Sequence, residues 1–505
     1  MKAEKVYDQT FTARNFNTSP LTISGLKGDL YDYELICSFT NFGTSANDLR
    51  LRFNSDSASN YRTYRMRGYG STANALVNDS QTYCLVGAIK STIESLSIIK
   101  ISGSSGDERY IDSFYCGENS ANNEVAKTSC YWKDTANELT SLSFDYSSNV
   151  TTDAHIILYR TPKEASQEQW ELMDRQSVTN RNLTTTPINF SGLKGDSDIQ
   201  YRIEFNGEWS SGAGDVHVQL NSDSATNYKN QLLRNQSGSI SASNFSTAGF
   251  QLAGTISVDT GINATAIINA ESGIKRLFTS SESPIAGGDD QQEIASWWSN
   301  TADEVTEIDI LQLSGSPSFS GTAKLYRRKN PNTIGDTLPF EMVEEVAVSG
   351  DFSAGHTFSG LSGDDVLMYK LEWLGDGDGT SRTNVNDLYL RAQFNGDTAA
   401  NYINQDLRSY GSSADANNTT KNHIEFFNTS IGGLENEGQF TCYIYPKSGE
   451  NRPCLIDSAV DYGNKLTKKG AGWWSNSSDE INSIKVFANQ TYSITGTLRL
   501  SRLTI

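Results

Sequence analysis

Long apolar runs are missing from this chain of 505 residues. No stretch approaches the roughly 18 uninterrupted apolar residues that a membrane span needs, and the opening segment MKAEKVYDQT has no apolar core like that of a secretory signal. These absences predict a protein that is made and folded in a cytoplasm and is not inserted into a membrane. The chain is nevertheless 36% hydrophobic and 10% aromatic, which is typical of a globular protein. Its length predicts roughly three domains.

Positive charge is also scarce. Forty-one Lys and Arg residues stand against sixty Asp and Glu residues, which gives a formal net charge of -19. Such a surface repels phosphate backbones and anionic lipid headgroups. The composition therefore argues against a nucleic-acid-binding role.

Histidine and cysteine, the residues that most often carry nucleophilic or metal chemistry, are few. The four histidines (His155, His217, His356 and His423) and the six cysteines (Cys37, Cys84, Cys116, Cys130, Cys442 and Cys454) do not recur with the internal repeat described next. A repeated catalytic triad, zinc site or disulfide framework is therefore not expected, and free buried thiols are predicted. Phosphate-binding and dinucleotide-binding glycine motifs are absent as well. No cofactor is predicted.

Three blocks of sequence each occur three times in the same order, spaced by roughly 165 to 175 residues. The first block is SGLKGD or SGLSGD, beginning at Ser24, Ser191 and Ser359. The second reads FNSDSASNY, LNSDSATNY and FNGDTAANY, beginning at Phe53, Leu220 and Phe394. The third contains Trp132, Trp298 and Trp474. The chain is thus predicted to consist of three tandem domains, over residues 1–164, 165–332 and 333–505.

Apolar and polar residues alternate along the segments around these blocks, as in Leu49, Leu51 and Phe53 against Arg50 and Arg52. Period two indicates strands with one buried face, and the Gly, Ser, Asn, Asp and Thr clusters between them favour turns. The predicted fold is all-β, with three tandem antiparallel β-sandwich or jelly-roll-like domains and very little helix. The best helical candidate is the segment 163–175, at a domain junction.

The second block begins where an alternating strand ends. Its Asn and Asp side chains can cap backbone groups as the chain turns, and its final Tyr can return to the core. We interpret the block as a structural corner, with a ligand site as the alternative. The corner residues are Asn54, Asp56, Asn60 and Tyr61; Asn221, Asp223, Asn227 and Tyr228; and Asn395, Asp397, Asn401 and Tyr402.

Carboxylates raise two further hypotheses. The corner aspartates recur together with Glu138, Glu304 and Glu480, and two carboxylates are enough for a glycosidase. Recurrence is also expected from a solvated acidic surface, so no catalytic residue is assigned. Asp376, Asp378, Thr380 and Asp387 partly match a calcium loop, but Ser381 stands where the turn requires Gly, and the other copies lack the pattern. No metal site is assigned, and a hairpin-tip insertion is the interpretation we prefer.

The doubled Trp residues of the second and third copies should point to opposite faces of a strand. We expect Trp298 and Trp474, like Trp132, to anchor the core, and Trp297 and Trp473 to contact a partner or a glycan.

These features resemble one protein family. A Trp followed by NTA or NSS, an acidic pair, an alternating strand, a Gly and a closing LYR-like strand resembles modules of tailed-bacteriophage virion proteins, and the FN.D...NY corner resembles the preceding half of such modules. The last copy departs by ending LRLSR, without the Tyr. The resemblance implies a β-sandwich used as a building or contact element, with no catalytic residues.

The leading hypothesis is therefore a non-enzymatic structural protein of a virion, assembled in a bacterial cytoplasm, that decorates the head or forms part of a fibre or tail appendage. Its implied partners are other capsid or tail proteins and further copies of itself. Alternatives are a tail receptor-binding protein that holds host surface glycans and, less favoured, a polysaccharide depolymerase.

Overall fold

The computed structural model describes most of the chain. It leaves out residues 1–2, 42–46, 90–94, 103–104, 106–108, 120–121, 164–169, 199, 212–213, 237, 257–260, 271, 273–275, 285–289, 316, 329–339, 379–386, 411–412, 431–435, 450, 461–465, 490–492 and 505. The regular secondary structure of the described part is almost entirely β-strand, which confirms the predicted fold class.

The first sandwich contains twelve strands. They are β1 (Glu4–Arg14), β2 (Leu21–Ser24), β3 (Tyr31–Asn41), β4 (Asn47–Phe53), β5 (Tyr61–Tyr69), β6 (Thr72–Gln81), β7 (Cys84–Ile89), β8 (Ser95–Ser102), β9 (Arg109–Asn119), β10 (Asn122–Trp132), β11 (Ser141–Tyr146) and β12 (Thr152–Pro162).

The second sandwich repeats this series and adds one short helix. Its elements are β13 (Trp170–Asn182), β14 (Ile188–Ser191), α1 (Gly195–Asp198), β15 (Gln200–Ser211), β16 (Gly214–Leu220), β17 (Tyr228–Gln236), β18 (Ser239–Thr247), β19 (Phe250–Ile256), β20 (Gly261–Asn269), β21 (Arg276–Pro284), β22 (Asp290–Trp298), β23 (Glu307–Leu311) and β24 (Ser318–Arg328). Trp170–Arg175 begins the edge strand β13, so the helical prediction for this segment is wrong. Pairing with β24 overrides the local pattern.

The third sandwich has the same order with a 3₁₀ turn. Its elements are β25 (Glu341–Asp351), β26 (His356–Ser359), η1 (Gly363–Asp365), β27 (Val366–Asp378), β28 (Asp387–Phe394), β29 (Tyr402–Tyr410), β30 (Ser413–Lys421), β31 (Ile424–Ser430), β32 (Asn436–Ile444), β33 (Arg452–Val460), β34 (Leu466–Trp474), β35 (Ser483–Ala488) and β36 (Ser493–Thr504). The predicted domain boundaries, at 164/165 and 332/333, lie outside the described residues.

Each domain pairs an eight-stranded sheet with a four-stranded sheet, and every strand pairing is antiparallel. In the first domain the orders are β1-β12-β3-β8-β9-β10-β5-β6 and β2-β11-β4-β7, and the other two domains repeat them. Strands from the beginning and the end of the domain alternate in the small sheet, as in a jelly roll. The hairpin β8–β9 is inserted into the large sheet, and β1 and β12 extend it.

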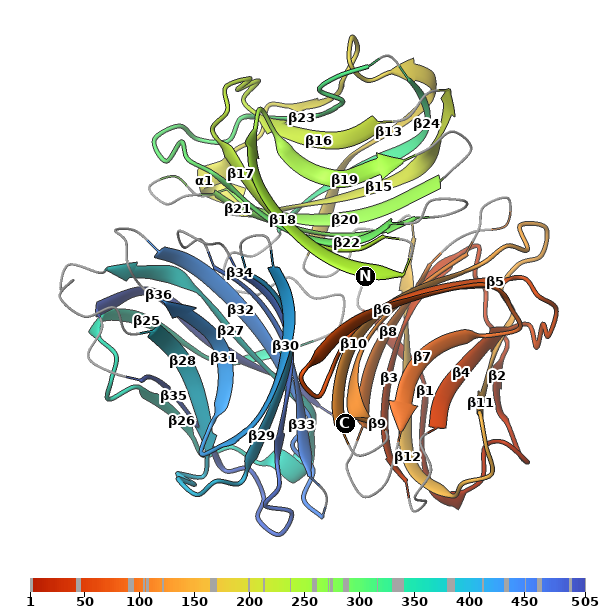
Figure 1. The fold of residues 1–505 in the computed structure, drawn as a ribbon, viewed down its shortest axis with the longest axis vertical. Coiled ribbons are helices and arrows are strands. Elements are labelled where there is room, and N and C mark those ends of the chain that lie inside the picture. Colours follow the sequence, from red (N-terminus) through yellow and green to blue (C-terminus); the bar gives the residue numbers. More distant parts are fainter. Residues whose placement is uncertain are drawn as a thin grey trace.

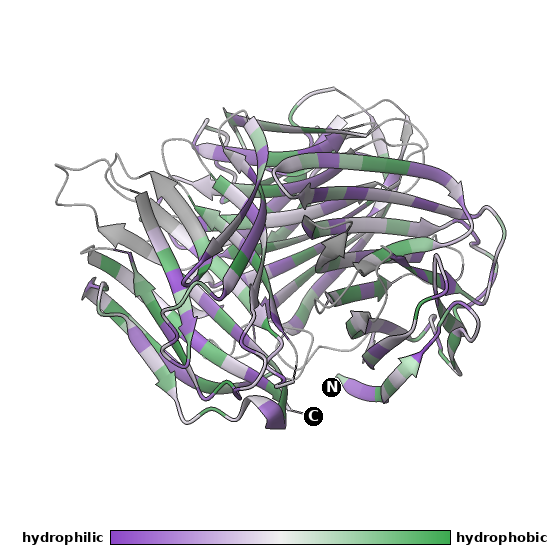
Figure 2. Ribbon diagram, turned by 60° about the horizontal axis from the view of Figure 1, so that its bottom comes forward, coloured by the Kyte–Doolittle hydropathy of each residue, from purple (hydrophilic) through white to green (hydrophobic). Residues whose placement is uncertain are grey.

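Alternation along the strands places one core inside each sandwich. In β4, Leu49, Leu51 and Phe53 are buried against the large sheet, while Arg50 and Arg52 point outward. Equivalent cores fill the second and third sandwiches. Figure 2 shows the resulting bands of hydrophobic and hydrophilic residues along the strands.

The three sandwiches surround a common centre (Figure 1). Their large sheets face one another there, and the equivalent strands β6, β18 and β30 contact each other around the axis. A separate apolar cluster lies between the domains and includes Met66 of the first, Leu233 of the second and Leu407 of the third. These three residues occupy the same position of the repeat, since each lies opposite the same site on the neighbouring strand. The chain is therefore a single-chain pseudo-trimer.

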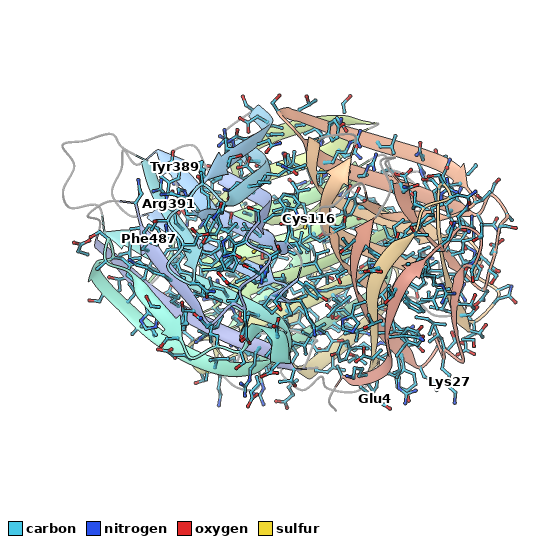
Figure 3. The ribbon with its side chains drawn as sticks, turned by 90° about the horizontal axis from the view of Figure 1, so that it is seen from below. Glu4, Lys27, Cys116, Tyr389, Arg391 and Phe487 are labelled. Carbon is cyan, nitrogen blue, oxygen red and sulfur yellow. A yellow bond between two sulfur atoms is a disulfide. The ribbon has the colours of Figure 1, made fainter. Side chains whose placement is uncertain are left out.

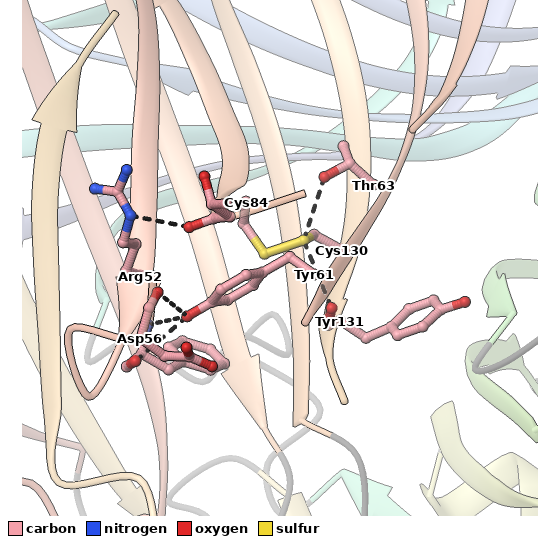
Figure 4. Close-up of a disulfide and its surroundings, with 9 residues drawn as sticks. Arg52, Asp56, Tyr61, Thr63, Cys84, Cys130 and Tyr131 are labelled. Carbon is pink, nitrogen blue, oxygen red and sulfur yellow. Dashed lines mark hydrogen bonds between the residues drawn. A yellow bond between two sulfur atoms is a disulfide. The ribbon is translucent and has the colours of Figure 1, made fainter. Parts of the chain in front are cut away.

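One pair of cysteines is bonded, contrary to the prediction of free thiols. Cys84 of β7 and Cys130 of β10 form a disulfide between the two sheets of the first domain (Figure 4), while Cys37, Cys116, Cys442 and Cys454 are buried and form no disulfide. The other copies fill the same slot differently.

In the second copy the slot holds Phe250 and Ser296, and in the third Ile424 and Gly472. A Cβ added at Gly472 would clash with Ile424. The disulfide was missed because only one copy of the repeat uses it.

Candidate functional site

The corner motif turns the chain from one sheet to the other, between β4 and β5 in the first domain. Asn54 and Ser55 both adopt positive φ, as do Asn221 and Ser222. Asn395 is followed by Gly396 in the same conformation. Asn and Gly tolerate this left-handed region better than most residues, which explains why Asn opens the motif in every copy.

The Asn side chain fastens the corner to the loop that follows the conserved Trp. Asn54 donates from Nδ2 to the Glu138 carbonyl at 2.8 Å, and its Oδ1 accepts from the Thr140 amide at 2.8 Å. Asn221 and Asn395 make the same bonds, to Glu304 and Thr306 and to Glu480 and Asn482. Both ends of the amide are thus satisfied within the domain.

The Asp side chain accepts three hydrogen bonds inside its own corner. Asp56 accepts from the Ala58 amide at 2.8 Å, from Asn60 Nδ2 at 2.9 Å and from Trp132 Nε1 at 2.6 Å. Asp223 and Asp397 repeat all three bonds. Burial would raise the pKa of each carboxyl, but these bonds outweigh it and lower the pKa.

The closing Tyr locks the corner to the strand before it. Tyr61 Oη accepts from the Phe53 amide at 2.9 Å, and its ring stacks on Trp132. Tyr228 and Tyr402 do the same. Figure 4 shows the Tyr61 hydroxyl directed at the corner residue Asp56. The contacts of all twelve corner residues lie within their own domain, which favours the structural interpretation over a ligand site.

A fully buried arginine completes each copy. Arg109 lies 5.2 Å from the Trp132 ring centroid and donates to the carbonyls of Asp134 and Asn137. Arg276 and Arg452 take the same position over Trp298 and Trp474. Sequence reasoning missed these arginines, although their spacing ahead of each Trp repeats.

The recurrent glutamates also have local partners. Glu138, Glu304 and Glu480 accept from the backbone amides of Asp29, Asp196 and Asp364 at 3.2 to 3.4 Å. Those aspartates in turn accept from Ser105, Ser272 and Ser448. The recurrent glutamates that motivated a glycosidase hypothesis therefore accept hydrogen bonds that stabilise loops.

The predicted contact residues Trp297 and Trp473 are fully buried, so their assignment as exposed partner or glycan contacts is wrong. Their orientation away from the domain core is as expected, but the neighbouring domains cover that face. Trp297 packs with Ala459 of the third domain, and Trp473 belongs to the apolar cluster between the domains.

A charged group occupies the same central position in each domain. Lys127, Glu293 and Lys469 each lie five residues before the conserved Trp, and each exposes 8% or less of its surface. Glu293 Oε2 lies 2.9 Å from Lys469 Nζ, and Glu293 Oε1 lies 3.8 Å from Lys127 Nζ. Each lysine has a second carboxylate within its own domain, Asp112 or Asp457, at 2.7 Å.

These ion pairs shift the pKa of all three groups toward the charged state. Burial would raise the pKa of Glu293, but Lys469 and Lys127 lower it. Burial would likewise lower the pKa of the two lysines, and their carboxylate partners raise it instead.

Polar side chains add bonds between domains. Gln291 donates to Ser129 Oγ at 3.0 Å, Gln405 donates to the Gly70 carbonyl at 3.0 Å, and Asn269 donates to Gln439 Oε1 at 3.3 Å. Every pair of domains is linked in this way. The centre is therefore a specific interface with both apolar and polar contacts.

The calcium-like segment falls largely on residues that are not described. Asp376 and Asp378 end β27 and Asp387 begins β28, while Thr380 and Ser381 lie outside the described residues. Among the described residues no group of three His, Cys, Asp or Glu side chains could hold a metal ion.

The outward faces of the small sheets differ among the copies, unlike the corners. In the first domain Arg50 lies opposite Asp145, and Arg52 forms an ion pair with Asp145. The second domain places His217 opposite Leu311.

In the third domain Arg391 lies opposite Phe487, with Tyr389 two residues away (Figure 3). Sequence reasoning did not single out this cluster, although the outward positions of each strand follow from the alternation.

Comparisons with known proteins identify no family. No family model and no curated protein matches the chain. None of the described helices is long and apolar enough to cross a membrane.

Among solved structures, a fructofuranosidase from Schwanniomyces occidentalis aligns at 10% identity and a TM-score of 0.15, over 51% of this chain and 64% of that one. OccK7 (OpdD) of Pseudomonas aeruginosa aligns at 10% identity and a TM-score of 0.09, over 89% of this chain and all of its own. Scores this low carry no argument about fold or activity.

Proposed function

We propose that this chain is a non-enzymatic structural component of a tailed-bacteriophage virion, acting as a rigid three-module block in decoration, fibre or adaptor contacts. The observation that carries the proposal is the pseudo-trimer. Three copies of one sandwich close around an axis with a buried apolar and charged interface, so that a single chain presents the same strand arrangement and the same corner three times.

Such an arrangement suits a binding partner that itself has threefold or near-threefold symmetry. Three matched contacts can engage together, and the second and third occur at high effective concentration because the domains are already held in place. The bonds between each pair of domains keep that spacing fixed. The repeated corner and Trp blocks, which resemble virion modules, support the same class of protein.

The test is the presence of the chain in purified particles. Peptide mass spectrometry should detect it at a constant ratio to the major capsid protein after density-gradient purification, with an abundant host cytoplasmic protein followed as the contamination control. Immunogold labelling should then place it on the head or on the tail, and either location fits the proposal. A chain that washes away with the host protein would overturn it.

The depolymerase alternative has a direct assay. Incubation of the purified chain with host envelope polysaccharide should leave the polymer length unchanged, because the recurrent Asp and Glu carboxylates bond to backbone and side-chain donors within their own loops. Shortened chains, absent with heat-denatured protein, would restore the enzymatic hypothesis.

A further inference from the structure

The outward face of the small sheet in the third domain combines aromatic and cationic side chains. On β28, Tyr389, Arg391 and Gln393 point away from the core, because Leu390, Ala392 and Phe394 point into it. On the adjacent strand β35, Phe487 lies opposite Arg391 and Lys485 lies opposite Gln393. Figure 3 shows Tyr389, Arg391 and Phe487 together at this side of the molecule.

Arg391 lies opposite Glu425 but forms no ion pair with a carboxylate in the described part of the chain. Its guanidinium lies 4.8 Å from the Tyr389 ring centroid, and its Nε has no hydrogen-bond acceptor within the described part of the chain. Burial lowers the pKa of Arg391, and Glu425, the residue opposite it on β31, counteracts this effect without forming an ion pair with it among the described contacts. Glu425 pairs with Lys421 instead.

Lys485 adds a second cation on this face. Its Nζ lies 5.2 Å from the Phe487 ring centroid, and no carboxylate pairs with it among the described residues. Lys485 and Arg391 are diagonal neighbours on adjacent strands, a spacing of about 7–8 Å between Cα atoms. Two cations that form no ion pair among the described residues thus lie beside two aromatic rings on a chain whose net charge is -19.

A neutral histidine directly precedes β31, two residues before the Glu425 that lies opposite Arg391. His423 is 5% exposed, and its Nδ1 lies 2.7 Å from Asn422 Oδ1. An Nδ1–H group that donates to Asn422 leaves Nε2 as an acceptor. Nε2 is buried, has no hydrogen-bond partner among the described residues and lies 4.0 Å from Glu425 Oε2. Burial, with help from Arg391 and Lys421, lowers the pKa of His423 to about 3, so the ring is uncharged at neutral pH.

We infer that this face of the third domain binds a carboxylate-bearing saccharide. Arg391 and Lys485 supply donors for the carboxylate, and Phe487 offers an apolar ring for one face of the sugar. Charge complementarity favours the acidic sugar over a neutral one. The Phe487 ring beside the two cations favours a sugar over a bare inorganic anion.

The other two domains provide internal comparisons for the site. Arg50 occupies the position equivalent to Arg391, three residues before the corner, but Asp145 stands opposite it where Phe487 stands in the third domain. In the second domain that position is His217, with Asp215 as the charged neighbour that acts on it. Arg50 also lacks an acceptor at Nε and lies 4.4 Å from the Tyr83 ring centroid, but among the described residues the third copy alone places an aromatic residue opposite the arginine. The site does not depend on the virion role proposed above.

Isothermal titration of the full chain with three probes tests the inference: tetragalacturonate, a hyaluronan tetrasaccharide and sialyllactose, in 150 mM salt. We expect at least one probe to bind, and Arg391→Gln to weaken that binding at least tenfold, because a charged hydrogen bond is lost. Phe487→Ala should weaken it several-fold. Arg50→Gln, the matched control, should leave it unchanged.

Several results would overturn the inference. They are the absence of binding by all three probes at millimolar concentration, equal weakening by Arg50→Gln, and equal affinity for methyl-esterified tetragalacturonate if tetragalacturonate is the probe that binds. Competition by sulfate at the same concentration as the saccharide would reduce the site to an anion site and overturn the saccharide assignment. Thermal unfolding curves of each variant check that a loss of binding is not a loss of folding.

Discussion

Replacement of Glu293 by Gln removes the one negative charge that Lys127 and Lys469 share between the domains. Breaking a buried ion pair by removal of one partner costs about 3–5 kcal/mol, because it leaves an uncompensated buried charge. Each lysine keeps its own aspartate, Asp112 or Asp457, so the expected loss lies near the lower end, at about 3 kcal/mol.

Urea unfolding followed by Trp fluorescence is the suitable assay. Trp297 and Trp473 are buried between domains and will report the loss of those contacts. Glu341→Gln is the matched control, since Glu341 pairs with Arg502 at the exposed surface and its loss should cost at most about 1 kcal/mol.

Glu293→Lys should destabilise the protein further than Glu293→Gln, because three lysines would then meet at the axis. A change below 1 kcal/mol for Glu293→Gln, no larger than that of the control, would refute the assignment of the central ion pairs as a stabilising element.

Three further predictions concern other parts of the fold. Cys130→Ser should lower the free energy of unfolding by about 4 kcal/mol, which is the chain-entropy value for a loop of 46 residues. In denaturation curves, reducing agent should destabilise the wild type by a similar amount and leave the variant unaffected. Acid should destabilise the corners, because the folded-state pKa of Asp56 and of its two equivalents is lowered. Their stabilising contribution is complete above the unfolded-state pKa of about 3.9 and is lost as the pH falls through the folded-state pKa. Asp56→Asn should reduce this loss of stability in urea titrations between pH 5 and pH 2. Trp473→Ala should cost about 3–5 kcal/mol in the same urea assay, whereas an exposed Trp would cost little.

Much of each domain could be predicted from the sequence, because the relevant signals are local and repeated three times. Alternation along β4 and its equivalents gave the sandwich class, and the recurrence of Asn54 and Asp56 gave the corner. The fixed backbone conformation at Asn54 has a direct sequence signature, since few residues tolerate it.

The relation between domains could not be predicted in the same way. Trp297 was expected to face away from its own core, and it does, but whether that face meets water or another domain depends on contacts more than one hundred residues apart along the chain. The bond between Cys84 and Cys130 likewise has no repeated spacing to reveal it. The cluster around Arg391 could not be predicted from the repeat, because its combination of residues does not recur in the other two copies.

The slot between the two sheets also shows how the copies have diverged. In each copy one residue from each of the two sheets fills this space, and the volume that each residue contributes differs among the copies. The pairs are Cys84 with Cys130, Phe250 with Ser296, and Ile424 with Gly472. A substitution that introduces the residue of another copy on one strand only, such as Gly472→Ser, places the new side chain against the larger partner of this copy, Ile424. A hybrid module made by exchanging one strand between copies would therefore mispack this slot, whereas exchange of both strands together would keep a matched pair.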